Sequence, residues 1–329
     1  MRTAARFPEA DPAAGLYESF YIKAADPAGG RALWLRHTIH KRPGAEPTGS
    51  LWLTFFDAGS EPRATKETYG AESLSVPAGA YVRIGEAEIG PTGLTGKLET
   101  AAMSAAWDIS FTDTHEALHH LPNERMYASK LPRTKLLSPH PGASFSGRLE
   151  LDGETIELAN WPGMVGHNWG SEHAERWVWI HGAGFEGRDP SDFLDIAAGR
   201  IEIGPWTTPW IANGAIALDG EVMKLGGLGK TYGTSIDAEP GSCEFVVPGK
   251  NVTVRGAVGA VLESFVAWVY ADPDGGEHNT INCSIADMKL RVERPNEQHV
   301  HLELNGGAAF ELGMRETDHG VPLQPYPDG

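Results

Sequence analysis

Residues 161–170 read WPGMVGHNWG, and residues 176–183, which read RWVWIHGA, follow closely. In the first stretch, His167 and Asn168 stand between glycines, which permit unusual backbone angles and close approach. In the second stretch, tryptophans alternate with other residues at the period of two that is typical of a half-buried strand. The two stretches predict β structure around an apolar pocket. Its aromatic walls are expected from Trp169, Trp177 and Trp179.

The same strand pattern extends over most of the chain. Short runs rich in β-branched and aromatic residues alternate with turn residues, and the 40 glycines and 23 prolines are spread along the sequence. The clearest runs are residues 51–56, 81–85, 177–181, 252–255 and 299–304. The sequence therefore predicts an all-β fold built from antiparallel barrels or sandwiches.

Two segments depart from this pattern. Residues 104–125 are expected to hold at most a turn or two of helix, which Pro122 ends. Residues 121–147 are rich in Pro, Lys, Arg and Ser and show little periodicity, so we expect a long ordered connection. Connections of that length are often functional.

Two Asp-Gly pairs, Asp152-Gly153 and Asp219-Gly220, predict hairpins with type I′ turns. The flanking residues 147–158 and 214–225 match each other loosely. Such a match has two explanations. It is either an echo between two related halves of the chain or the pattern that all hairpins of this kind share.

Composition limits the possible functions. The 329 residues suffice for two ordinary domains or one large β domain, and 41% hydrophobic and 22% charged residues are typical of globular proteins. A formal charge of −17 argues against nucleic acid and anionic membranes as partners. The chain shows neither a secretory signal pattern nor an apolar run of about 18 residues. Cys243 and Cys283 suit a reducing cytosol at least as well as a disulfide, so we expect a cytoplasmic protein of undetermined oligomeric state.

Metal motifs are weak. Residues 115–119 read HEALH, which matches the H-E-x-x-H string of zinc proteases, but Pro122 leaves little room for the required helix. We therefore expect a polar loop there. His299 and His301 would share one face of a strand, whereas His37 and His40 would face opposite sides. No nucleophile elbow, phosphate loop or dinucleotide fingerprint appears in a fitting context, so the sequence predicts neither a metal nor a cofactor.

Asp195 stands in the apolar run FLDIA over residues 193–197. A carboxyl group in an apolar pocket has a raised pKa and can donate a proton near neutrality. On the solvent face of a half-buried strand the same residue would be an ordinary surface carboxylate. The pattern alone leaves both interpretations open.

These residues resemble the hydroxyneurosporene synthase (carotenoid 1,2-hydratase) and AttH-like group of lipocalin-like proteins, to which tocopherol cyclases and lipocalin-like Diels–Alderases are related. The resemblance rests on residues 166–170 with the aromatic strand after them, and on the acidic position at Asp195. The upstream elements 131–133, 138–139 and 145–147 also match. It is clear over the middle third of the chain.

The resemblance implies two lipocalin-like antiparallel β-barrel or sandwich domains in tandem, with boundaries expected at residues 1–170 and 171–329. It implies an apolar ligand and a proton donor at Asp195, while His167 and Trp169 match the histidine and tryptophan of the motif. Phe193 stands where the hydratases have a tyrosine. We also expect Asn168, Trp177, Trp179 and Phe193 to contact the substrate, and His167 to orient Asp195 or to accept a proton.

Three functions are compatible with this pattern. One is a lyase-type hydratase or cyclase of isoprenoid metabolism, carotenoid biosynthesis included, in which Asp195 protonates an alkene and tryptophans stabilise the carbocation. Another is a pericyclase of the Diels–Alderase type, which works by shape and hydrogen bonds. The third is a non-catalytic carrier of a lipophilic ligand. A fourth interpretation is purely structural: His167, Asn168 and the tryptophans would merely join two domains.

Overall fold

Most of this chain forms β-strands, because residues that suit a buried position alternate with residues that suit an exposed one. Along β9 (Ser104–Thr112), for example, exposed and buried side chains alternate from end to end. The computed structural model describes residues 3–204 and 206–326. The helical elements in these ranges are short. They are the helix α1 (Glu124–Ala128) and the 3₁₀ segments η1 (Phe7–Glu9), η2 (Ala71–Ser73), η3 (Leu228–Gly233) and η4 (Leu262–Ser264).

The first sheet has 12 strands, all antiparallel, in the order β4-β3-β2-β1-β12-β11-β9-β8-β7-β6-β5, with β10 paired to β11. Besides β9, its strands are β1 (Leu16–Ala25), β2 (Arg31–Lys41), β3 (Thr48–Asp57), β4 (Arg63–Tyr69), β5 (Leu74–Ser75), β6 (Val82–Ile84), β7 (Ala87–Ile89), β8 (Gly93–Glu99), β10 (Leu118–His119), β11 (Thr134–Leu151) and β12 (Glu154–Gly170).

The second sheet has 10 strands in the order β18-β17-β14-β13-β24-β23-β21-β20-β19, with β22 paired to β23. Its strands are β13 (Arg176–Ala183), β14 (Phe193–Arg200), β17 (Ile211–Leu218), β18 (Glu221–Gly226), β19 (Ser235–Glu239), β20 (Ser242–Pro248), β21 (Thr253–Gly259), β22 (Val266–Ala271), β23 (Glu277–Glu293) and β24 (Val300–Met314). A small separate hairpin joins β15 (Glu202–Ile203) to β16 (Trp206–Thr207).

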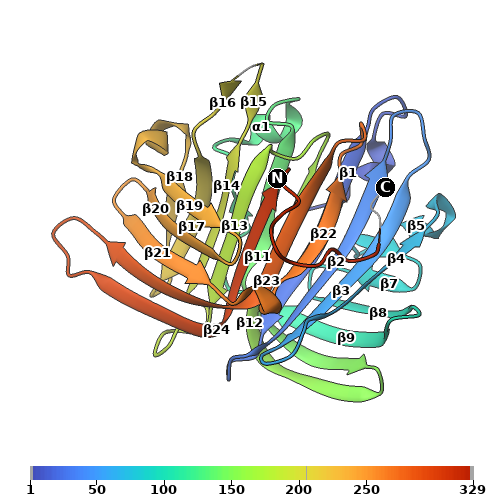
Figure 1. Cartoon of the computed structure of the whole chain (residues 1–329), viewed down its shortest axis with the longest axis horizontal. Helices are drawn as coiled ribbons and strands as arrows, with labels where there is room; N and C mark the ends of the chain where they lie inside the picture. Colours follow the sequence, from blue (N-terminus) through green and yellow to red (C-terminus); the bar gives the residue numbers. More distant parts are fainter. Residues whose placement is uncertain (1–2, 205, 327–329) are drawn as a thin grey trace.

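The two sheets share one connectivity. In each, the first strand pairs with the last, β1 with β12 and β13 with β24, and the long penultimate strand continues the order. The predicted fold class, two lipocalin-like antiparallel β units in tandem, is confirmed (Figure 1). Residues 16–170 form the first sheet and residues 176–314 the second. We propose on this basis that the domains meet at residues 170 and 171.

Both predicted type I′ hairpins are present. Asp152 and Asp219 have φ angles of 51° and 54°, and the glycines after them have 82° and 80°. However, the first hairpin joins β11 to β12, whose counterparts in the second sheet are β23 and β24, whereas the second joins β17 to β18. The match between residues 147–158 and 214–225 is therefore the shared pattern of hairpins. What the two halves of the chain share is the order of their strands, with the first strand of each sheet paired to the last.

Two expectations about the middle of the chain were wrong. Residues 104–112 form strand β9, and the short α-helix begins only at Glu124, beyond Pro122. Much of the supposed connection over residues 121–147 belongs to the 18-residue strand β11. Its pairing with β12 shifts register between Leu137 and His140 and again before Ala143. Bulges of this kind and two prolines interrupt the period of two, which hid the strand.

The junction of the two sheets lies along strands β1–β3 and β22–β24 (Figure 1). β2 is buried on both faces, so Leu33 and Leu35 point into the core of the first sheet, while Trp34 points to the second. There Trp268 of β22, fully buried, packs against Trp52 and Trp34 with ring centroids 5.0 Å and 6.4 Å away. One apolar cluster therefore spans both sheets.

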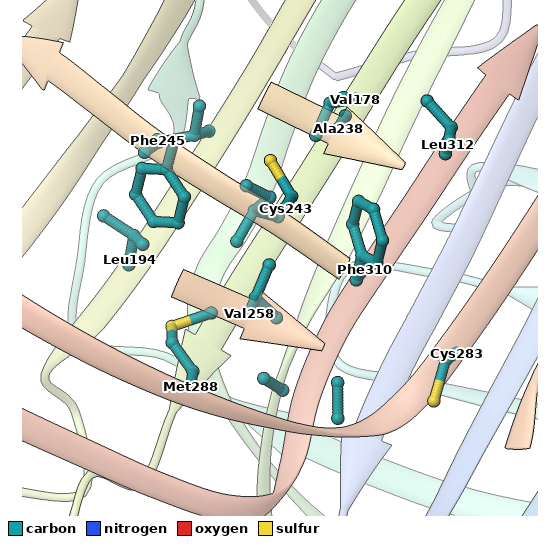
Figure 2. Packing of buried hydrophobic residues seen from close by; sticks show 14 of the residues in the cluster. Val178, Leu194, Ala238, Cys243, Phe245, Val258, Cys283, Met288, Phe310 and Leu312 are labelled. Atoms are coloured by element: carbon teal, nitrogen blue, oxygen red, sulfur yellow. The ribbon is translucent and has the colours of Figure 1, made fainter. Parts of the chain in front are cut away.

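Both cysteines are free and lie in this cluster (Figure 2). Cys243 comes from β20 and Cys283 from β23, and burial raises the pKa of each thiol to about 12. They therefore pack as small apolar side chains. Among the described residues, no helix has both the length and the apolar character that crossing a membrane requires.

Truncating the indole at the junction should destabilise the protein strongly. We expect Trp268→Ala to lower the free energy of unfolding by about 3–5 kcal/mol, because it leaves a cavity between the two sheets. The matched control is Trp206→Ala, since Trp206 is 77% exposed and should change stability by less than about 0.5 kcal/mol. Denaturant unfolding followed by circular dichroism measures both. Equal losses for the two variants would contradict the packing described.

Candidate functional site

A cavity of about 350 Å³ opens at the junction of the two sheets. β1, β2, β11 and β12 of the first sheet contribute to its wall, and so do β13, β14, β17, β22 and β24 of the second. The lining is mostly apolar and aromatic, with a few polar groups, as in small-molecule sites. The polar members on which the chemistry depends are His120, Ser138, Asn168 and Asp195.

Asp195 of β14 is buried in the cavity wall and surrounded by hydrogen-bond donors. Ser138 Oγ–H donates to its Oδ2 at 2.5 Å, and Trp179 Nε1–H donates to its Oδ1 at 3.2 Å. His120 Nε2 lies 3.3 Å from Oδ2 and 3.0 Å from Ser138 Oγ. The carboxyl group, the hydroxyl and the imidazole thus form one connected group, which we call the Asp195 triad.

The hydrogen bonds of the triad can accommodate a shared proton. His120 Nδ1 lies 3.4 Å from the Asn213 carbonyl oxygen, which only accepts, so a hydrogen on Nδ1 suits this contact. Ser138 gives its single hydrogen to Asp195. His120 Nε2 then faces only acceptors, so a hydrogen on Nε2 suits its contacts as well. Moving that proton to Asp195 reverses the chain of donors without changing the total. The triad can therefore hold one transferable proton.

The pKa of Asp195 is lowered, whereas a carboxyl group in a purely apolar pocket would have a raised pKa. Burial alone would raise the pKa of this carboxyl group, but the charges and hydrogen bonds of its neighbours outweigh burial. His120 acts through charge and a hydrogen bond, His181 through charge, and Ser138 through a hydrogen bond. Burial of Asp195 was one of the two alternatives that the sequence left open. Its polar partners were not predicted, and they stabilise the carboxylate form.

The roles of His120 and Ser138 as partners of Asp195 were not predicted from the sequence. His120 directly follows the H-E-x-x-H string, and Ser138 lies in the segment taken as a connection. The short strand β10 pairs with β11 through Leu118 and Ser138, and this pairing places His120 beside the hydroxyl. Two signals were available: a long proline-rich segment is often functional, and residues 138–139 belong to the elements that match the family.

Strand alternation divides the central motif between two faces of β12. Asn168 lines the cavity, and its Oδ1 accepts from Ser19. His167 points to the other face, where its Nε2 lies 2.8 Å from Glu18 Oε1 and its ring stacks on Phe20. The expected contact between His167 and Asp195 is not among the hydrogen bonds of the described residues. His120 makes that contact instead.

Through Glu18, His167 helps to hold the N-terminal segment in place. The Glu18 carboxylate also accepts hydrogen bonds from the backbone N–H groups of Arg6 and Phe7, at 2.8–3.0 Å. Burial lowers the pKa of His167, although Glu18 opposes this effect. Trp169, on the same face, stacks on His167 at 4.5 Å and packs near Tyr127 of α1. This side of β12 therefore ties the N-terminal segment and α1 to the sheet.

The predicted aromatic residues of the second sheet are only partly in the cavity. Trp177 and Trp179 of β13 line it, and Trp177 Nε1–H donates to Glu311 at 2.9 Å. Tyr21 of β1 meets Trp179 edge-on at 5.5 Å. Phe193 lies on the same face of β14 as Asp195 but outside the cavity lining, fully buried and packed edge-on against His115. The absence of a tyrosine hydroxyl at Phe193 therefore removes no group from the cavity lining.

The H-E-x-x-H string forms no helix: residues 115–117 lie in a loop, and Leu118–His119 form β10. His115 Nδ1 lies 3.0 Å from Asp113 Oδ1, and His119 packs against Tyr127. The two imidazoles therefore lack the shared helical face of a zinc protease. The loop that the sequence predicted is present, with the short strand as an addition.

Comparison of the sequence with known proteins finds no matching family model. An uncharacterised protein of Mycobacterium tuberculosis is 26% identical over 314 residues, which cover 93% of this chain and 88% of the relative. The similarity thus extends over nearly the whole of both chains.

Two solved structures share the architecture. A protein provisionally assigned as AttH from Nitrosomonas europaea has a TM-score of 0.53 and 13% identity, covering 94% of this chain and 97% of its own. Kievitone hydratase from Nectria haematococca has a TM-score of 0.51 and 13% identity, covering 93% and 90%. At these identities the likeness is one of fold. This chain therefore has the two-unit β fold of the AttH-type protein and of kievitone hydratase, as the resemblance implied.

A pH-dependent stability should arise beside the triad, at His181. Its Nε2–H donates to the Pro141 carbonyl oxygen at 3.0 Å, and burial, aided by the charge of Lys23, lowers its pKa to about 4. Below pH 6.5 the unfolded chain binds a proton at this residue and the folded chain does not. Stability is therefore lost as pH falls from 6.5 to 4, by about 3 kcal/mol at most.

The measurement is urea unfolding of the wild type and of His181→Gln at several pH values. Glutamine keeps a donor for Pro141 but does not titrate, so the stability gap between the two proteins should narrow by up to about 3 kcal/mol between pH 6.5 and pH 4. His301→Gln, on the exposed face of β24, is the control. A gap that stays constant with pH would show that His181 titrates normally.

Proposed function

We propose that this chain is a hydratase-type enzyme that adds water to an isolated double bond of an apolar, isoprenoid-like molecule. One observation carries the proposal: a connected carboxyl, hydroxyl and imidazole group, which can hold a transferable proton, lies in the wall of an apolar cavity. The hydratase among the proteins of the same fold supports it. Asp195 keeps the acid role implied by the resemblance, and His120 takes the orienting role expected of His167.

The reaction begins with proton transfer from the triad to one alkene carbon. A C–H bond forms from the π electrons, and the other carbon becomes a carbocation. A water molecule then adds its oxygen to the cation, a C–O bond forms, and the proton released returns to the triad. Atoms and charge balance without a further reactant. The same steps in reverse dehydrate the alcohol.

The walls near the triad suit a cationic intermediate. The Trp179 indole in the cavity wall offers cation–π stabilisation, worth about 2 kcal/mol or more when water is excluded. Tyr21 stays neutral because burial raises the pKa of its phenol well above the usual value. Asn168 lines the cavity beside these rings and offers its amide to the water or to a polar substituent of the substrate.

The charged groups Arg36 and Glu311 of the cavity lining are already engaged. The Arg36 guanidinium lies over the Tyr270 ring at 4.2 Å. Glu311 accepts from Trp177 at 2.9 Å and from Asn282 at 3.2 Å. A ligand thus meets mainly apolar surface away from the triad, which favours an apolar hydrocarbon skeleton.

Asp195→Asn should abolish hydration while preserving binding. The substitution removes the carboxyl group that donates the proton to the alkene, and we expect the rate to fall by about 100-fold or more. The assay incubates the chain with a panel of apolar isoprenoid alkenes in ¹⁸O-water and detects added ¹⁸O by mass spectrometry. His120→Gln should show a similar loss, whereas Asp237→Asn, on an exposed position of β19, should retain full activity.

Other outcomes would point elsewhere. Unchanged turnover in both triad variants, with binding intact, would favour a pericyclic reaction driven by the shape of the cavity. Recovery of only unaltered ligand from the wild type, with tight binding, would indicate a carrier.

A further inference from the structure

Three potential metal ligands from separate segments meet beside the cavity. His173 lies in the loop after β12, Asp272 directly follows β22, and His278 lies near the start of β23. One ligand atom from each lies within 4.8 Å of the others. His173 lines the cavity, so this cluster borders the candidate site without sharing a residue with the Asp195 triad.

Asp272 connects the two imidazoles. Its Oδ1 accepts from the backbone N–H and from the Nδ1 of His173, both at 2.7 Å. Its Oδ2 lies 3.6 Å from His278 Nδ1, too far for a hydrogen bond. The carboxylate thus fixes His173 and leaves one oxygen facing His278 across a gap.

His278 is the anomaly in this cluster. Its side chain is fully buried, and neither ring nitrogen has a hydrogen-bond partner among the described residues. His173 Nε2 is buried without a partner as well. Burying a polar nitrogen in this way is costly, and an ion bound by the group is one of the arrangements that removes the cost.

Aromatic rings hold the imidazoles in place. The His173 ring stacks between Tyr17, at a centroid distance of 4.0 Å, and Trp177, at 5.4 Å. The edge of His278 meets the same Trp177 ring at 5.3 Å. An apolar shell that orients the ligands is typical of metal sites in proteins. Nearby, the Arg315 guanidinium is balanced by Glu175 at 3.1 Å.

We propose that His173, Asp272 and His278 bind one divalent first-row transition metal ion, for which Zn²⁺ is the probe. Two imidazoles and one carboxylate form a donor set that suits such ions, whereas Ca²⁺ and Mg²⁺ prefer oxygen ligands alone. Three protein ligands leave a coordination position for water. The inference goes beyond the proposed function, because binding is measured without any substrate.

The sequence could not predict this site. The ligands lie about a hundred residues apart along the chain, His173 on one side and the pair Asp272 and His278 on the other. No metal motif has such a spacing, and the expectation of no metal rested on motifs. The pairing of β22 with β23 and the loop after β12 bring them together.

The test is metal binding by the full chain after removal of metal with a chelator. We expect one Zn²⁺ per chain by elemental analysis after reconstitution and dialysis, and Co²⁺ in its place should give a visible absorption band of a nitrogen- and oxygen-ligated ion. His278→Gln and Asp272→Asn should each weaken binding by about 100-fold or more. His37→Gln is the matched control, because His37 is also buried with unpartnered ring nitrogens but lies outside the cluster.

Circular dichroism checks that each variant folds. If a variant does not fold, the number of Zn²⁺ ions bound per wild-type chain still tests the site. Absence of bound Zn²⁺ and of a Co²⁺ band in the reconstituted wild type would overturn the proposal. So would binding that both cluster variants retain but that His115→Gln or His119→Gln abolishes. Hydration activity without metal binding would reject this site and leave the proposed function standing. Metal binding without hydration activity would support the site and reject the proposed function.

Discussion

The packing of Trp268 against Trp34 and Trp52 is the contact on which the rest of the structure depends. It joins two curled sheets whose strands follow the same order. Each sheet buries its own interior, but β2 and β3 also carry large apolar side chains on the outer face. The second sheet is what covers those apolar side chains and removes them from water. The cavity lies at this junction and takes walls from both sheets, so neither unit alone can form the site.

Strand alternation then decides which side chains reach the cavity. On β12, Asn168 faces the cavity, while its neighbours His167 and Trp169 hold the N-terminal segment and α1 on the other face. On β13, Trp177 and Trp179 share the cavity face because they lie two residues apart. A compact sequence motif therefore combines a cavity-lining side chain with residues that support the wall.

The sequence predicted what depends on local pattern. The all-β class, the hairpins at Asp152 and Asp219, and the aromatic cavity wall of β13 follow from periodicity and turn chemistry, whereas the two lipocalin-like units follow from the family resemblance. It missed what depends on pairing between distant strands. His120 and Ser138 become partners of Asp195 only because β10 pairs with β11, and bulges conceal that strand. No local pattern records such contacts, since a one-residue change of register would alter all of them.

The lowered pKa of Asp195 makes the proposed chemistry more coherent. An alkene is a weak base, so its protonation needs a strong acid. A solitary carboxyl group in an apolar pocket would keep its proton, but its raised pKa would make it a weak acid. In the triad the two demands are divided. His120 holds the proton and passes it within the triad to Asp195, and Ser138 and Trp179 stabilise the carboxylate that remains once Asp195 has donated it to the alkene. Burial then protects the proton and the cation from bulk water, and the partners of Asp195 supply the acid strength that burial alone would remove.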